Sequence, residues 1–110
     1  MEDKVKICIL LDIYENLLTE KQRELLNDYY NNDLSLSEIA ENEGITRQAV
    51  RDNLKKGENN LLEYESKLSL MKNMQDREKL ASDIEKILEK IPNIDESQLE
   101  KIKNTLNKMI

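Results

Sequence analysis

The chain has 110 residues, of which 36% are charged and 38% hydrophobic, with a net charge of −6 and neither Trp nor Phe. This composition predicts one small helical domain, or a small domain with a helical extension. No apolar run approaches the roughly 20 residues of a membrane span, so we expect a cytoplasmic protein with no membrane contact. The chain has no histidine and only Cys8 as a thiol, which excludes the common His-based catalytic arrangements and a zinc site. We therefore expect no enzymatic activity and no cofactor.

Two helices are predicted before residue 35. The first runs from about Asp3 to Leu17. One side of it holds an apolar line that should be buried, and three further residues widen this buried face. The line is Val5, Cys8, Ile9, Ile13 and Leu17, and the others are Ile7, Leu10 and Leu11. A capping box of Thr19 and Gln22 starts the second helix, in which each side chain bonds the other residue's backbone N–H. That helix carries Leu25, Leu26, Tyr29 and Tyr30 and ends at the polar sequence NNDLS.

Residues 35–56, SLSEIAENEGITRQAVRDNLKK, have the spacing of a helix-turn-helix. Ser35 and Glu38 form a second capping box, so a helix should begin at Leu36. Gly44 should end it, because a chain that turns back there commonly needs a positive φ, which glycine adopts without strain. Thr46 is the expected N-cap of the next helix. Ile39 and Ala40 before the turn, and Val50 and Leu54 after it, are predicted to pack inward.

The outward side chains of this next helix are the candidate nucleic-acid contacts. In a helix-turn-helix the first half of the second helix meets base edges. Arg47 and Gln48 suit guanine and adenine, whereas Arg51, Lys55 and Lys56 suit phosphates. Residues 46–57 carry four bases against one acid, and they form the only basic patch of an otherwise acidic chain. The alternative is a stable three-helix core whose outer helix carries solvated charges or makes protein contacts.

The same helix is predicted to be long. A heptad-like apolar pattern continues through Val50, Leu54, Gly57, Leu61, Tyr64, Leu68 and Met71, which favours a helix of more than 25 residues. Gly57 either allows another helix to approach closely or marks a kink, and the pattern does not choose between them.

Two more helices follow the polar sequence KNMQD. The fifth holds Leu80, Ala81, Ile84, Ile87, Leu88 and Ile91 and ends at Pro92. Asp95 and Gln98 should cap a sixth, which carries Leu99, Ile102, Leu106 and Met109. The predicted architecture is thus all-α, with a helix-turn-helix domain at residues 1–72 and a helical hairpin at residues 73–110. The hairpin is expected to pack on the long helix or on a partner chain.

The sequence LLTEKQRELLNDYYNNDLSLSEIAENEGITRQAVRDNLKK resembles region 4 of bacterial sigma factors in outline. More specifically, with the preceding LDIYENLL, it resembles the small YlxM-type helix-turn-helix proteins over about residues 10–70. The resemblance implies an all-helical, cytoplasmic bacterial protein, regulatory in role and associated with the signal recognition particle pathway, the gene lying beside that of the particle's GTPase. The motif residues it assigns are Thr46, Arg47, Gln48, Arg51, Asp52 and Asn53. Two positions depart from the family pattern: Glu43 replaces an apolar residue, which predicts a looser hinge, and Gly57 interrupts the basic helix.

Two classes of function follow. The first is a nucleic-acid-binding accessory factor of the signal recognition particle pathway, whose target is RNA or DNA. The second is a protein-interaction module that acts on the targeting GTPase or as a homodimer. A DNA-binding transcription regulator is a third reading of the same helix-turn-helix.

Overall fold

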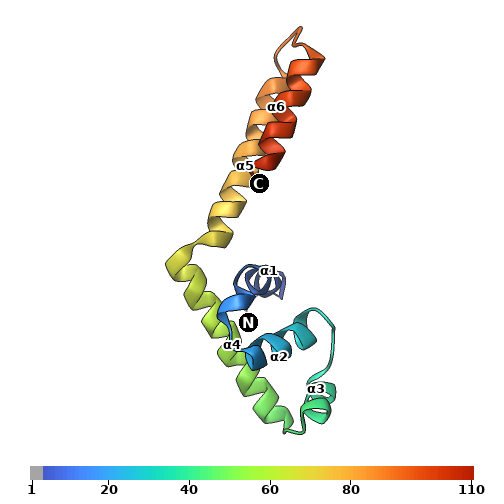
Figure 1. The fold of residues 1–110 in the computed structure, drawn as a ribbon, viewed down its shortest axis with the longest axis vertical. Helices are drawn as coiled ribbons and strands as arrows, with labels where there is room; N and C mark the ends of the chain where they lie inside the picture. The colour runs from blue at the N-terminus through green and yellow to red at the C-terminus, as the bar shows by residue number, and fades with distance from the viewer. Residues whose placement is uncertain (1–3) are drawn as a thin grey trace. The chain divides into compact units, whose positions relative to one another are not determined.

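A computed structural model describes residues 4–110 of the chain, and every regular element in that range is helical (Figure 1). The all-α prediction is confirmed. The elements in order are α1 (Lys4–Tyr14), the 3₁₀ turn η1 (Glu15–Leu17), α2 (Glu20–Tyr30), α3 (Leu36–Glu43), α4 (Arg47–Leu68), α5 (Leu70–Glu89) and α6 (Glu96–Lys108). They form two compact units, one ending at Met71 and the other from Lys72 to Ile110.

The first unit is built around α4, which contacts α1, α2 and α3 (Figure 1). Its core is aliphatic apart from one tyrosine. The side chains that are fully buried there are Ile7, Leu10, Leu11, Tyr14, Leu25, Leu26, Ile39, Val50 and Leu61. Residues from four helices therefore meet in one core, and α4 contributes to it over several turns.

The predicted inner face of α1 is wrong at both ends. Val5 is 64% exposed and Leu17 is 54% exposed. The three residues predicted to widen the buried face, Ile7, Leu10 and Leu11, are fully buried, and Tyr14 completes their line. Leu17 leaves the line because α1 ends at Tyr14 and continues as a tighter 3₁₀ turn. Asp3, the predicted start, lies outside the described residues.

The predicted start of α2 is confirmed. The backbone N–H of Gln22 donates to Thr19 Oγ1 at 3.2 Å, and the backbone N–H of Thr19 donates to Gln22 Oε1 at 3.4 Å. Cys8, expected to be buried, is only half-buried, with its Sγ 3.9 Å from the carbonyl oxygen of Tyr30.

Gly57 marks a close approach of two helices, not a kink. It is buried within the continuous helix α4. A Cβ built on it would lie 2.7 Å from Leu26 Cδ1 and 3.3 Å from Leu26 Cγ. Next to this contact, the hydroxyl of Tyr30 donates to Glu58. The glycine therefore lets α2 lie directly against α4.

The prediction that α4 exceeds 25 residues is wrong, because the helix has 22 residues and ends at Leu68. Ser69 adopts a left-handed conformation with φ 54° and breaks the helix. Two side chains then satisfy the first N–H groups of α5: the N–H of Leu70 donates to the hydroxyl of Tyr14 at 3.1 Å, and that of Met71 to Glu65 Oε1 at 3.0 Å. The same carboxylate oxygen accepts the Tyr14 hydroxyl at 2.7 Å.

Helix α5 also begins earlier than predicted, since the polar sequence KNMQD lies inside it. Those five residues include neither glycine nor proline, so nothing in them disrupts a helix. The break falls instead at Ser69.

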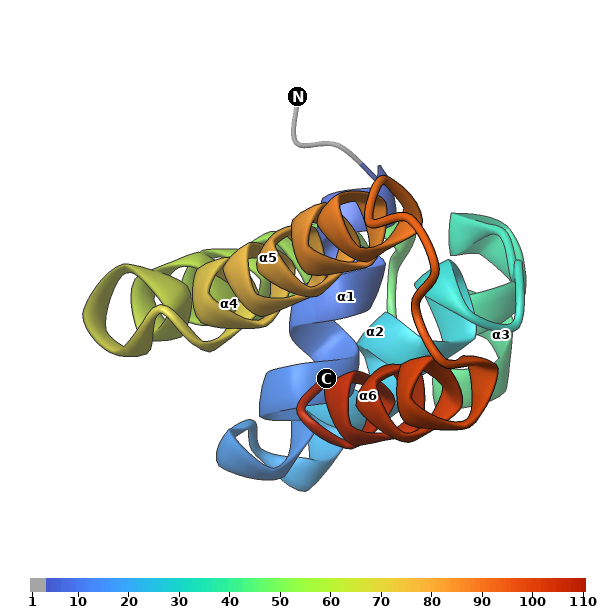
Figure 2. The same cartoon turned by 90° about the horizontal axis from the view of Figure 1, so that it is seen from above.

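The second unit consists of most of α5 and of α6, which runs back in the opposite direction after the turn at Pro92 (Figures 1 and 2). Asp95 is the N-cap of α6 as predicted, although its carboxylate accepts from the N–H of Ser97 at 2.9 Å and not from that of Gln98. Only Ala81 and Leu106 are buried among its described apolar side chains. The predicted hairpin is therefore thinly packed.

Candidate nucleic-acid interface

Helix α3 and the turn after it are fixed by local hydrogen bonds. The N–H of Glu38 donates to Ser35 Oγ and the N–H of Ser35 to Glu38 Oε1, each at 3.1 Å, so the predicted capping box is present. Gly44 has φ 66°, the left-handed conformation that was expected. The N–H of Ile45 then donates to the carbonyl of Ala40 at 3.1 Å, which closes the end of the helix.

The start of α4 is equally well defined. Thr46 is its N-cap, and its Oγ1 accepts the backbone N–H of Ala49 at 3.0 Å. Val50 and Leu54 are buried on the inner side, as predicted. The turn and the cap therefore fix which side chains of α4 face outward.

All eight side chains predicted to contact nucleic acid are exposed. They are Thr46, Arg47, Gln48, Arg51, Asp52, Asn53, Lys55 and Lys56. Exposure is what an interface requires, but it does not test binding, so their role stays a prediction.

Three cations share one face of α4. Arg47, Arg51 and Lys55 are spaced four residues apart, and such residues lie on the same side of a helix. Asn53 does not join them, because it is two residues from both Arg51 and Lys55 and hence about 200° around the helix. The predicted contact residues therefore do not all lie on one face of α4: the three cations share a face, and Asn53 lies on a different side of the helix.

Two of the predicted readers already have partners within the chain. The guanidinium Nη1 of Arg47 donates to Ser37 Oγ on α3 at 3.3 Å, and Gln48 Nε2 donates to Asp52 Oδ1 at 2.9 Å. To bond a base edge, the Gln48 amide would have to leave Asp52. Ser37 was not predicted from the sequence, where its place in the first turn of α3 was the only signal.

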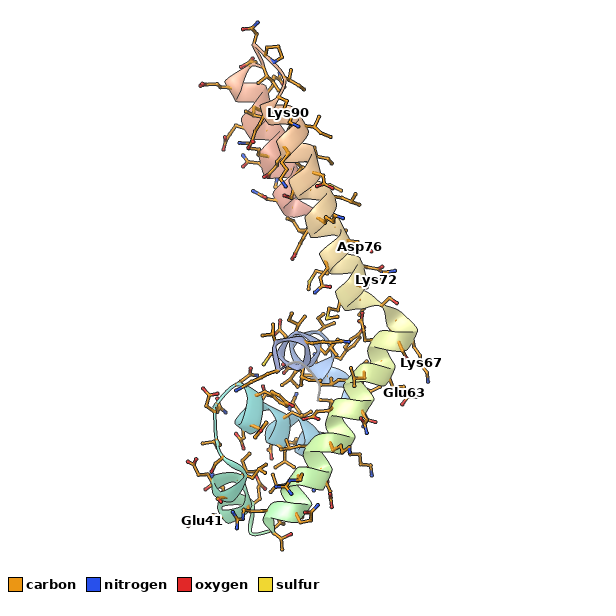
Figure 3. All side chains as sticks on the ribbon, turned by 180° about the vertical axis from the view of Figure 1, so that it is seen from behind. Glu41, Glu63, Lys67, Lys72, Asp76 and Lys90 are labelled. Carbon is orange, nitrogen blue, oxygen red and sulfur yellow. The ribbon has the colours of Figure 1, made fainter. Side chains whose placement is uncertain are left out.

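The other cations are available to a ligand. Among residues 4–110, Arg51, Lys55 and Lys56 form no ion pair. Farther along α4, by contrast, Lys67 pairs with Glu63 at 3.0 Å, and both side chains lie on the outer side of the helix (Figure 3). The positive charge near the start of α4 is therefore not neutralised by the described side chains.

Glu43 does not leave the hinge loose as expected, because its half-buried carboxylate pairs with the ammonium group of Lys21 on α2. The hydrogen bond that Lys21 donates to this carboxylate is the main cause that raises the pKa of Lys21 above its ordinary value. Of the other α3 acids, Glu38 is used in the capping box, whereas Glu41 is exposed (Figure 3).

Two further features are absent from residues 4–110. No cluster of His, Cys, Asp and Glu side chains there is placed to hold a metal ion. In the same range no helix combines the length and apolarity that crossing a bilayer requires.

The capped helices, the glycine turn and the outward second helix define the first unit as a helix-turn-helix of the all-α class. The chain belongs to the family described as "UPF0122: Putative helix-turn-helix protein, YlxM / p13 like", which matches residues 1–105. This confirms the resemblance to the YlxM-type helix-turn-helix proteins.

Curated relatives agree with this assignment. A UPF0122 protein of Clostridium botulinum is 44% identical over 108 residues, which cover 94% of this chain and 99% of the relative. A UPF0122 protein of Listeria welshimeri is 46% identical over 102 residues, which cover 90% of this chain and 93% of the relative. A UPF0122 protein of Clostridium kluyveri is 52% identical over 82 residues, which cover 72% of this chain and 74% of the relative. The similarity therefore extends over most of the chain and beyond the helix-turn-helix.

Proposed function

We propose that this protein binds nucleic acid through the first three turns of α4. The proposal rests on one observation: Arg47, Arg51 and Lys55 line one exposed face of a helix whose N-terminus is set by a glycine turn and a threonine cap. Membership of a helix-turn-helix family supports it.

Within this interface we assign Arg51, Lys55 and Lys56 to phosphates. They are exposed cations without an ion pair among the described residues, so a phosphate would replace only water around them. Arg47 and Gln48, at the start of the helix, are assigned to base edges. In the free protein Asp52 accepts a hydrogen bond from the Gln48 amide, so a base edge that bonds this amide must replace Asp52.

The family resemblance further suggests that the protein acts as a regulatory accessory factor of the signal recognition particle pathway in the cytoplasm, so the particle's RNA is one candidate target. The deep, narrow major groove of A-form RNA does not admit a helix, so on RNA we expect contacts to phosphates or to a distorted loop. On duplex DNA, α4 would enter the major groove in the usual way.

The test is fluorescence anisotropy with labelled duplex DNA and with the structured RNA of the particle, each at several salt concentrations. Three to five phosphate contacts predict that log K falls with log salt with a slope of about −3 to −5 on duplex DNA. The double variant Arg47→Ala, Arg51→Ala should weaken binding by tenfold or more, and loss of the phosphate contact assigned to Arg51 should reduce the slope by about one.

The matched control is Lys101→Ala, Lys108→Ala, which removes the same charge from exposed positions of α6. Circular dichroism checks that both variants are folded. Absence of binding to either probe at low salt, or equal binding by the two double variants, would refute the proposal.

A further inference from the structure

Helix α5 and the turn directly after it carry an apolar line that the described residues leave largely exposed. Leu80, Ile84, Ile87 and Ile91 are 60%, 41%, 62% and 46% exposed. Their spacings of four, three and four are those of the contact line in a left-handed coiled coil. Ile91 lies just beyond the helix, in a turn held by the hydrogen bond from its N–H to the carbonyl of Leu88 at 3.2 Å. We call these four residues the α5 seam.

The α5 seam is distinct from the residues that the hairpin itself covers. A second apolar line on α5 lies one position after the seam residues in the sequence. It is buried at Ala81 and half-buried at Met74 and Leu88. On α6 the corresponding residues are Leu99, Ile102 and Leu106, which are also half-buried or buried. The hairpin thus uses one apolar line of α5 and leaves the other in solvent.

The second unit is too small to be stable on this packing alone. It spans residues 72–110, and its only buried apolar side chains are Ala81 and Leu106. Units below about 40 residues usually need a disulfide, a metal or oligomerisation. The chain's one cysteine lies in the first unit, and residues 4–110 contain no cluster for a metal. A further helical layer over the exposed apolar line would supply stability that the hairpin's own packing lacks.

Charge favours a second copy of the hairpin as that layer. Residues 72–110 contain eight acids and eight bases, so the unit is neutral, whereas residues 1–71 carry the entire net charge of −6. Two hairpins meet without net repulsion. A strongly acidic or basic partner would gain no attraction from this unit as a whole.

The order of residues in the α5 seam is self-complementary when two copies run antiparallel. With a two-fold axis between residues 85 and 86, Leu80 lies opposite Ile91 of the second copy, and Ile84 lies opposite Ile87. All four positions are then matched by apolar side chains, as a symmetric interface requires.

The charges beside the α5 seam select the same orientation. Asp83 lies on α5 directly before Ile84, and Lys90 lies directly before Ile91 in the turn after the helix ends at Glu89 (Figure 3). If the helical register continues through this turn, as the α5 seam does, both residues occupy the same flanking position one heptad apart. In antiparallel helices this flank meets the same flank of the partner, so Asp83 approaches Lys90 of the second copy, twice in the dimer. In parallel helices the flank would meet Ala81 or Leu88, which carry no charge.

We propose that the α5 seam is a homodimer interface, in which two hairpins join antiparallel as a four-helix bundle. The test is sedimentation of the full chain between about 1 and 200 μM. The wild type should pass from monomer to dimer in this range. Ile87→Lys, at the most exposed position of the seam, should shift the dissociation constant upward by at least tenfold. Because its side chain is exposed in the single chain, the variant should keep the same circular dichroism spectrum.

The matched control is Met109→Lys, since Met109 is 61% exposed in the same unit but lies off the α5 seam. It should dimerise as the wild type does. A wild type that stays monomeric throughout, or a dimer that Ile87→Lys leaves intact, would overturn the proposal. Equal weakening by Met109→Lys would also overturn it.

Charge exchange tests the orientation. Asp83→Lys alone and Lys90→Asp alone each turn two attractive pairs into two repulsive ones, so each should weaken the dimer about tenfold at low salt. The double variant Asp83→Lys, Lys90→Asp should restore wild-type affinity. Failure of the double variant to recover would overturn the antiparallel register.

Discussion

Replacement of Gly57 by alanine tests the contact on which the position of α4 depends. In an exposed helix this substitution stabilises by about 1 kcal/mol, because alanine has the higher helix propensity. Here, however, the new Cβ would lie 2.7 Å from Leu26 Cδ1, closer than real Cβ contacts come. Leu26 is fully buried, so its end has no free space into which to move.

Two opposing terms set the magnitude. Overpacking of a tight core costs about 1–3 kcal/mol, against the helix-propensity gain of about 1 kcal/mol. We expect Gly57→Ala to lower the free energy of unfolding by about 1 kcal/mol net. In a unit of this size that corresponds to a fall in Tm of roughly 4–8 °C.

Urea denaturation followed by circular dichroism measures the change. Asn59→Ala, at an exposed position of the same helix, is the control and should be neutral or slightly stabilising. In a Leu26→Val background, which removes the clashing atom, Gly57→Ala should become neutral or stabilising. If Gly57→Ala raises stability in the native background, or lowers it equally in both backgrounds, the close-packing argument is wrong.

Three further predictions concern stability. Tyr14→Phe removes the hydroxyl that bonds Glu65 and the N–H of Leu70, so it should lower the free energy of unfolding, measured by urea denaturation, by about 1–3 kcal/mol. The control Tyr64→Phe, whose hydroxyl bonds only the carbonyl of Leu17, should lower it by less than about 1 kcal/mol. Gly44→Ala meets no atom within 4 Å but requires φ 66°, so it should cost about 1–2 kcal/mol by the same measurement. Burial, and then the hydrogen bond to Glu58, raise the pKa of Tyr30 above its ordinary value of 10.0. Because the unfolded chain then loses this proton at lower pH than the folded chain, the stability that Tyr30 contributes should be complete below pH 10 and fall as the pH rises further. In a series of urea denaturations at rising pH, Tyr30→Phe should flatten that fall.

The features that the sequence predicted correctly are those fixed over a few residues. The Ser35 and Thr19 capping boxes and the Thr46 cap each join groups three positions apart, and the Gly44 turn depends on one backbone angle. Such interactions join only neighbouring residues, so their partners can be read from the local sequence. This is why the boundaries of α2, α3 and the start of α4 were predictable, and with them the outward set of α4.

The features that the sequence did not predict depend on distant partners. The end of α4 is set by Tyr14 and Glu65, which are 51 positions apart. Gly57 had two readings until Leu26 was found against it. On α1 the pattern predicted one broad buried face, and the buried Tyr14, which the pattern did not include, centres that face on the line of Ile7. In each case the missing information was a contact between helices.

The contrast between a net charge of −6 and a cationic α4 yields a last prediction, on salt dependence. From Arg47 to Lys56 the basic stretch covers about 14 Å of helix, and Glu63 lies roughly 24 Å from Arg47 along the axis at 1.5 Å per residue. At physiological ionic strength the Debye length is about 8 Å, so most distant acids are screened and the local charge of +3 governs the encounter.

At about 10 mM salt the Debye length grows to roughly 30 Å, and the acids of the whole chain oppose a polyanion. We therefore expect a plot of log K against log salt that is steep above about 100 mM and flattens below it. A variant with Glu15→Gln and Glu63→Gln, which removes two acids near the far end of α4, should straighten the plot at low salt and leave the steep part unchanged. A plot that is linear for the wild type down to 10 mM would mean that the distant acids do not act on the bound nucleic acid.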